Sequence, residues 1–262
     1  MHQKPLFVDF QNITVAQNTK VIIHDLSVQI PDGEHVAILG PNGSGKSTFI
    51  RTLIREQYPV HAETGRVFRI WGEEVWDVFT LRSQFGYVSH DLQCTFNRNI
   101  SGREVILSGF FSSIGLFFHT ITQEMENRAD EICSFLEISH LAHRSFSEMS
   151  TGEARRFLIG RALVHNPRVL ILDEPSNSLD LHALHMLRRM MRKITERTVI
   201  ILVTHSLQDI IPEIGRVILF KDGTIYQDGP KETILSDENI GAVFNVPVRI
   251  VHHDGYYYAT GY

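Results

Sequence analysis

The chain has 262 residues, of which 43% are apolar and 21% charged, as in a globular protein with a substantial core. Its net charge of −5 leaves no basic excess to bind a phosphate backbone, so we expect no nucleic-acid partner. The two cysteines, Cys94 and Cys133, form no C-x-x-C pair, which is typical of reduced thiols in a cytosol. The longest apolar stretch, residues 105–118, is broken by Ser and Gly and is shorter than the ~20 residues that span a bilayer. We therefore expect a chain that does not cross a membrane by itself.

Strand patterns dominate the first 90 residues. Alternating apolar and β-branched residues predict strands, and a glycine-rich loop after the third of them leads into a helix. The predicted strands cover residues 6–13, 21–30, 34–39, 65–70 and 86–88, and the predicted helix covers residues 46–55.

Helical patterns follow over residues 89–164, where residues 123–136 form an amphipathic helix. Strand and helix then alternate again. Continuous apolar runs in this part are typical of parallel strands that are covered on both faces. These runs are residues 168–172, 198–203 and 216–220, followed by a hairpin turn at 221–224 and a strand pair in 244–258. The pattern predicts an α/β core interrupted by a helical insertion.

A glycine-rich segment between the third strand and the helix fits G-x-x-x-x-G-K-[ST]. Its backbone N–H groups and the helix N-terminus would bind phosphate oxygens. Lys46 would reach the β- and γ-phosphates of a nucleotide, and Ser47 would coordinate Mg²⁺. The expected binding residues are Gly40, Pro41, Asn42, Gly43, Ser44, Gly45, Lys46, Ser47 and Thr48.

Two acids, Asp173 and Glu174, end the apolar run at 168–172. Asp173 is placed to hold the magnesium through water, and Glu174 to orient or deprotonate the attacking water. Two acids after a strand could also be a solvated loop edge, but the phosphate loop favours the catalytic interpretation.

Between these elements lies Ser150-Thr-Gly-Glu153, which is a capping box. With the helix after it, this segment resembles the signature of ABC ATPases. Residues 174–180 (Glu-Pro-Ser-Asn-Ser-Leu-Asp) resemble the D-loop of that family, and Val203-Thr-His205 resembles its switch histidine. The order and spacing match from about residue 20 to about residue 230.

The resemblance implies a P-loop NTPase fold of the ABC ATPase type, with an antiparallel β subdomain and an inserted α-helical subdomain. The whole chain would form one such domain. Its implied parts are a nucleotide-binding core with the β subdomain (1–88 and 165–230), a helical signature subdomain (89–164) and a short C-terminal extension (231–262).

The resemblance also implies a head-to-tail dimer of two cassettes, expected to be a homodimer, with two ATP molecules between them. Ser150 and Gly152 would bind the γ-phosphate of ATP held by the partner. His205 would contact that phosphate and Glu174 from the catalytic side, together with Lys46, and Asp180 would couple the two sites. Hydrolysis would release the dimer and turn chemistry into motion.

Two departures from the family pattern stand out. Where the family has a magnesium-ligating glutamine, this chain has His90, with Gln93 three residues later. We favour Gln93 as the ligand, because an amide oxygen suits a hard cation. No aromatic residue stands near Ala16 or Gln17, where the family stacks adenine, so the preference for ATP over GTP is expected to be weak.

By fold-level analogy, such a cassette powers transport through a transmembrane permease, at the cytoplasmic face of the membrane. The apolar segment 105–118 would form the core of the helical subdomain, and any exposed share of it would form a docking groove for the permease. The segment and the tail are similar to those of molybdate-related and metal-chelate importer cassettes. Two alternatives are a soluble ABC ATPase in cofactor assembly and a slowly hydrolysing, ATP-gated binding module.

Overall fold

A computed structural model describes residues 4–60, 65–89, 92, 95–96, 100–116 and 119–262. Two compact units make up the chain: residues 1–82 with 199–262 form the first, and residues 83–198 form the second. Helix α2 (Val78–Gln84) is continuous across the boundary between them. Within the described ranges, no helix combines the length and apolarity that a membrane span requires.

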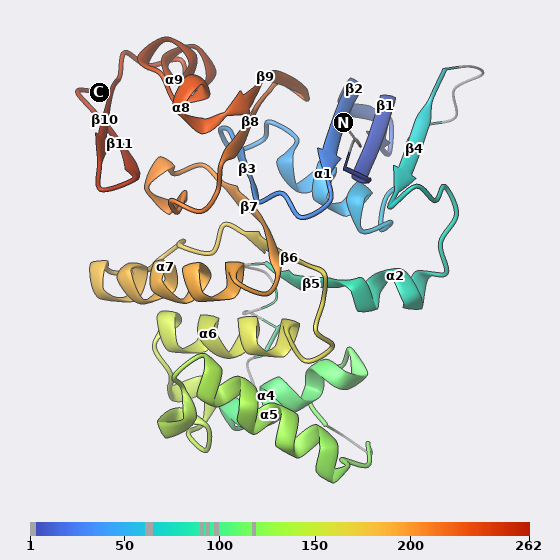
Figure 1. The fold of residues 1–262 in the computed structure, drawn as a ribbon, viewed down its shortest axis with the longest axis vertical. Helices are drawn as coiled ribbons and strands as arrows, with labels where there is room; N and C mark the ends of the chain where they lie inside the picture. The colour runs from blue at the N-terminus through green and yellow to red at the C-terminus, as the bar shows by residue number, and fades with distance from the viewer. Residues whose placement is uncertain (1–3, 61–64, 90–91, 93–94, 97–99, 117–118) are drawn as a thin grey trace. The chain divides into compact units, whose positions relative to one another are not determined.

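The first unit contains a three-stranded antiparallel sheet, ordered β2-β1-β4 (Figure 1). Alternate residues of β1 are buried, including Val8, Phe10, Ile13 and Val15, as expected for a sheet with one face on a core. Its strands are β1 (Leu6–Gln17), β2 (Lys20–Pro31) and β4 (Val67–Ile70).

A second sheet in this unit pairs β3 in parallel with β7 on one side and with β8 on the other. All four residues of β3 are buried, as the continuous apolar run predicts. A hairpin adds β9 antiparallel to β8. The strands are β3 (Val36–Leu39), β7 (Val199–Thr204), β8 (Arg216–Lys221) and β9 (Thr224–Pro230).

Helix α1 (Lys46–Leu53) packs between these two sheets through Phe49, which is fully buried. The Phe49 ring lies 6.1 Å from that of Phe10 on β1 and 5.5 Å from that of Phe220 on β8. Aromatic pairs at such separations add to the burial energy of each ring. The helix that follows the phosphate loop is therefore fixed to both sheets.

The C-terminal segment folds onto the first unit as two short helices and a hairpin, drawn in red in Figure 1. Strand β11 packs against the one-turn 3-10 helix η4 (Leu207–Asp209), which follows β7. The elements are α8 (Lys231–Ile234), α9 (Asp237–Phe244), β10 (Arg249–His253) and β11 (Tyr256–Thr260).

The second unit pairs β5 (Phe85–Val88) in parallel with β6 (Val169–Asp173), and its described residues include the helices α4 to α7. Two glycines allow close helix packing. A Cβ atom on Gly102 would lie 2.6 Å from the Phe157 ring, and one on Gly160 would lie 3.1 Å from Ile106. The helices are α4 (Gly102–Ser108), α5 (Gln123–Phe135), α6 (Thr151–Ala162) and α7 (Leu181–Thr195), with the one-turn helices η1 (Gly109–Phe111), η2 (Ser139–Leu141) and η3 (Phe146–Glu148).

Every strand that the sequence predicts is confirmed, with shifts of a few residues at the ends. The predicted helix at 46–55 ends at Leu53, because Arg55 adopts a left-handed backbone (φ 61°). In the segment 105–118, Val105, Ile106 and Leu107 are buried, which confirms the core interpretation for that part. Helices α2, α8 and α9 are not among the predicted elements.

The β8–β9 turn contacts both β2 and the phosphate loop through Gly223. Its N–H donates to the Ser44 carbonyl at 3.0 Å, and its carbonyl accepts from the His24 N–H at 3.0 Å. Gly223 has φ 75°, and a Cβ atom there would lie 2.1 Å from the Ile22 carbonyl oxygen. Only glycine satisfies both conditions.

We predict that Gly223→Ala destabilises the protein more than Gly33→Ala does. Both residues have positive φ, so each substitution costs about 1 kcal/mol of backbone strain. A Cβ atom on Gly33 would meet nothing within 4 Å. A Cβ atom on Gly223 would clash with Ile22, and such overpacking lowers the free energy of unfolding further, by about 1–3 kcal/mol. Urea-unfolding midpoints of the two variants measure the difference. Equal shifts of the two midpoints would show that the close approach of Gly223 to Ile22 does not affect the free energy of unfolding.

Candidate functional site

The phosphate loop begins directly after β3 and ends at α1. Gly43 and Gly45 have φ of 80° and 105°, which lie in the left-handed region that glycine tolerates. A Cβ atom on Gly43 would meet nothing within 4 Å, so the backbone there is open to a ligand. Ser47 is exposed at the first turn of α1. The loop therefore has the curled backbone and helix N-terminus of a phosphate cradle.

The Lys46 side chain is only 5% exposed and its ammonium is held by the loop itself. It donates to the carbonyls of Gly40 at 2.7 Å and Pro41 at 3.0 Å. A buried ammonium is costly unless its hydrogen bonds are satisfied. The two carbonyls thus keep the Lys46 ammonium inside the loop. Its positive charge would attract an anionic ligand most strongly there.

Ser44 gives a second indication that the loop fits an anion. Its side chain is 3% exposed, and its Oγ has no hydrogen-bond partner among the residues that the structure describes. A buried hydroxyl without a partner costs about 1–3 kcal/mol. A phosphate oxygen would satisfy this donor, so the residues present suit a nucleotide phosphate group.

His205, the predicted switch histidine, follows β7, the strand beside β3. Leu39 and Thr204 are register partners, and the Gly40 N–H donates to the Thr204 carbonyl at 3.4 Å. Parallel strands end at the same edge of a sheet, where ligands of open α/β folds bind. The first unit therefore places His205 and the phosphate loop at neighbouring strand ends.

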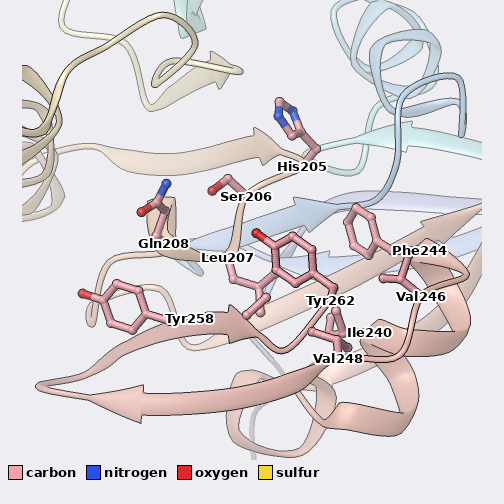
Figure 2. A pocket seen from close by; sticks show the side chains of 11 residues that line it. His205, Ser206, Leu207, Gln208, Ile240, Phe244, Val246, Val248, Tyr258 and Tyr262 are labelled. Carbon is pink, nitrogen blue, oxygen red and sulfur yellow. The ribbon is translucent and has the colours of Figure 1, made fainter.

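A cavity of about 410 Å³ lies between the loop after His205 and the C-terminal segment (Figure 2). Three of the described lining residues have ionisable side chains, namely His205, Tyr258 and Tyr262. The described lining residues are His205, Ser206, Leu207, Gln208, Ile240, Phe244, Val246, Val248, Tyr258, Ala259 and Tyr262. The C-terminal segment thus forms one wall of this cavity, and residues 205–208 form another.

In the second unit, the two acids at the end of β6, Asp173 and Glu174, each accept a hydrogen bond. The Tyr87 hydroxyl on β5 donates to Asp173 Oδ2 at 3.3 Å. The Asn177 amide donates to Glu174 Oε2 at 2.6 Å. Glu174 also has φ 49°, an uncommon conformation for a residue with a side chain. Such backbone strain concentrates at functional sites, and here it coincides with the predicted catalytic acid.

The signature segment forms the N-terminus of α6. Ser150 Oγ accepts from the Glu153 N–H at 3.3 Å, and the Glu153 carboxylate accepts from the Ser150 N–H at 2.8 Å, so the predicted capping box is confirmed. The bond from the Ser150 N–H holds the pKa of Glu153 below its ordinary value. The Ser150 hydroxyl also bonds to the Glu153 carboxylate, which lowers that pKa further.

Gly152 and Asp180 lie next to this cap. A Cβ atom on Gly152 would lie 2.6 Å from the Ala183 Cβ in the first turn of α7. Asp180 is the N-cap of that helix, and its Oδ1 accepts from the Ala183 N–H at 2.7 Å. The structure therefore brings Ser150, Gly152 and Asp180 together at two adjoining helix N-termini.

The predicted residues thus form two groups, one in each unit. The first unit holds residues 40–48 and His205, and the second holds Asp173, Glu174 and the Ser150–Gly152–Asp180 cluster. Both candidates for the magnesium-ligating glutamine position, His90 and Gln93, lie outside the described residues.

Sequence reasoning missed the partners of the two acids. Tyr87 is two residues after the start of β5, opposite Ile171 in the parallel register. Its contact with Asp173 requires knowing that β5 and β6 are neighbours, which no local pattern shows. Asn177 lies only three residues after Glu174, and a turn joins them through the Asn177 N–H and the Glu174 carbonyl at 3.3 Å.

The comparisons agree with this geometry. Residues 23–177 match the family model described as ABC transporter. The ABC transporter ATP-binding protein YlmA of Bacillus subtilis is 30% identical over 250 residues, which are 94% of each chain. A protein described as a metal-chelate type ABC transporter, solved in an inward-facing conformation, shares the fold, with a TM-score of 0.76, 20% identity and coverage of 97% and 96% of the two chains.

A bacterial ABC transporter cassette, MJ0796, solved as a dimer, is similar at a TM-score of 0.67 and 25% identity, over 85% of this chain and 98% of that one. The family model alone covers more than half of the residues. The chain therefore belongs to the ABC transporter family and is an ATP-binding, ATP-hydrolysing subunit of that kind.

Proposed function

We propose that two copies of this chain close head to tail around two ATP molecules and drive transport through separate membrane subunits. The observation that carries this is the division of the site residues. One unit holds a complete phosphate cradle, and the other exposes Ser150 and Asp180 at capped helix N-termini. Helix N-termini bind anions, so Ser150 and Gly152 would complete a phosphate site offered by a partner chain.

ATP is bound in this proposal by the loop from Gly40 to Thr48. Lys46 would contact the β- and γ-phosphates, and the N–H groups of Gly43 and Gly45 would cradle them. The open backbone at Gly43 and the buried Ser44 hydroxyl support these contacts. The partner's signature segment would contribute the Ser150 hydroxyl and the Gly152 N–H to the same γ-phosphate.

Hydrolysis would be carried out by the groups of the second unit together with His205. Glu174, oriented by Asn177, would accept a proton from the attacking water, and His205 would bind the γ-phosphate. Ser47 and Asp173, with Gln93, would hold Mg²⁺, which neutralises the charge that develops on the phosphate oxygens. Tyr87 would keep the Asp173 carboxylate in place.

The transport partner in this proposal is a transmembrane permease, which would hold the cassette at the cytoplasmic face of the membrane. In the second unit, Phe110, Phe111, Ile114 and Leu116 are only half-buried, unlike Val105–Leu107. These four residues are apolar surface that a permease segment could cover.

Replacing Glu174 with Gln should trap the ATP-bound dimer. The substitution removes the general base and leaves an amide of the same shape, so we expect turnover to fall at least about 100-fold. Light scattering in the presence of ATP should then report a dimer, and without ATP a monomer.

Adding Lys46→Ala is the control, because it removes the buried ammonium of the phosphate loop. The double variant should stay monomeric with ATP. A dimer that forms equally well without nucleotide, or in the double variant, would contradict the sandwich arrangement.

Weak discrimination between ATP and GTP is the second expectation. Gln17 ends β1 and is exposed, so it offers no aromatic face for adenine. Turnover of the two nucleotides should differ by less than about fivefold, and Gln17→Tyr should increase the preference for ATP, since a good aromatic stack is worth ~1 kcal/mol, or about a factor of five. Steady-state kinetics measure both. A strong ATP preference in the unaltered chain would overturn this expectation.

The membrane partner can be tested with the trapped variant. Glu174→Gln is affinity-purified with ATP from gently solubilised cells, beside the Lys46→Ala/Glu174→Gln control. We expect a polytopic membrane protein that is retained in near-stoichiometric amount only by the dimer-forming variant. Recovery of a soluble partner alone would instead indicate an ABC ATPase that acts away from membranes.

A further inference from the structure

Thr204, the last residue of β7, is 1% exposed, and both of its oxygen atoms are hydrogen-bonded. Its carbonyl accepts from the Gly40 N–H at 3.4 Å. Its hydroxyl accepts from the Ser206 N–H at 3.0 Å and donates to Asp209 Oδ2 at 2.5 Å. The Asp209 side chain is fully buried, so its carboxylate is a fixed acceptor.

These bonds hold both peptide groups that flank His205. The peptide between residues 204 and 205 is held through its carbonyl by Gly40. The peptide between residues 205 and 206 is held through its N–H by the Thr204 hydroxyl. Fixing the two peptide planes on either side of a residue fixes its φ and ψ. The direction in which the His205 side chain leaves the backbone is therefore set by Thr204.

Asp209 determines how the Thr204 hydroxyl is used. A hydroxyl has one proton and two lone pairs, and its proton rotates to suit the neighbours. A carboxylate can only accept, so it draws the proton toward Oδ2 and leaves a lone pair for the Ser206 N–H. The Asp209 N–H also donates to the Ser206 carbonyl at 3.2 Å, which closes the turn.

We propose that Thr204 and Asp209 are positioning residues that hold His205 in its working orientation. The proposal rests on the role of His205 in hydrolysis given above. Thr204 also bonds to Gly40 through its carbonyl. The same residue therefore holds both the histidine and the start of the phosphate loop. Misplacing a catalytic group by about 1 Å can cost up to 100-fold in rate.

Thr204→Val tests the proposal, because valine keeps the shape and removes the hydroxyl. We expect single-turnover ATP hydrolysis to slow about tenfold, with ATP affinity unchanged within about twofold. Thr204→Ser keeps the hydroxyl and should restore at least half of the rate. Ser108→Ala is the matched control, since Ser108 is also fully buried and donates to a backbone carbonyl at 2.6 Å, in the second unit.

The decisive measurement repeats Thr204→Val in a His205→Ala background, with enzyme in excess over radiolabelled ATP so that slow hydrolysis is measured over hours. If Thr204 acts through His205, the substitution has no further effect there. Three outcomes would overturn the proposal. The first is that Thr204→Val lowers the hydrolysis rate equally with and without His205→Ala. The others are that Thr204→Val alone lowers the rate less than twofold, or that Thr204→Ser does not restore it.

The same data separate this proposal from the function on which it rests. Hydrolysis at the unaltered rate by His205→Ala would refute the proposed role of His205. If His205→Ala is slow but Thr204→Val is not, the histidine role stands and only the positioning role fails.

Discussion

Parallel pairing of β3 with strands on both sides is the constraint on which the first unit depends. Because β7 and β8 run in the same direction as β3, the segments that follow all three strands begin at one edge of the sheet. The phosphate loop follows β3, the switch histidine follows β7, and the β8–β9 turn follows β8. A Cβ atom on Gly40 would lie 2.3 Å from the Phe220 carbonyl oxygen, which shows how closely these segments approach.

The predicted phosphate loop is held from several directions by contacts within the first unit. Phe49 anchors its helix to both sheets, Gly223 bonds to Ser44, and Thr204 bonds to Gly40. Lys46 adds two bonds to carbonyls of the loop. Contacts of this kind reduce the conformational freedom that a loop can lose on binding a ligand, which leaves more of the binding energy for affinity.

The sequence was most informative where a residue's role depends on its near neighbours. The phosphate loop, the capping box at Ser150 and the strand that ends in Asp173 are all local patterns, and the structure confirms their secondary structure. The contacts of Tyr87 with Asp173 and of Gly223 with Ser44 join residues far apart in the chain, so no spacing predicts them. Thr204 was part of the family resemblance, but its bonds to Asp209 and Ser206 depend on how the turn folds.

The position of Gly223 has a practical consequence for anyone who labels this protein. A short Asp-Gly turn between two antiparallel strands resembles a permissive site for an epitope tag or a fluorophore loop, since hairpin tips usually tolerate insertions. Here the turn bonds to Ser44 and contacts Ile22, so an insertion would press directly on the phosphate loop.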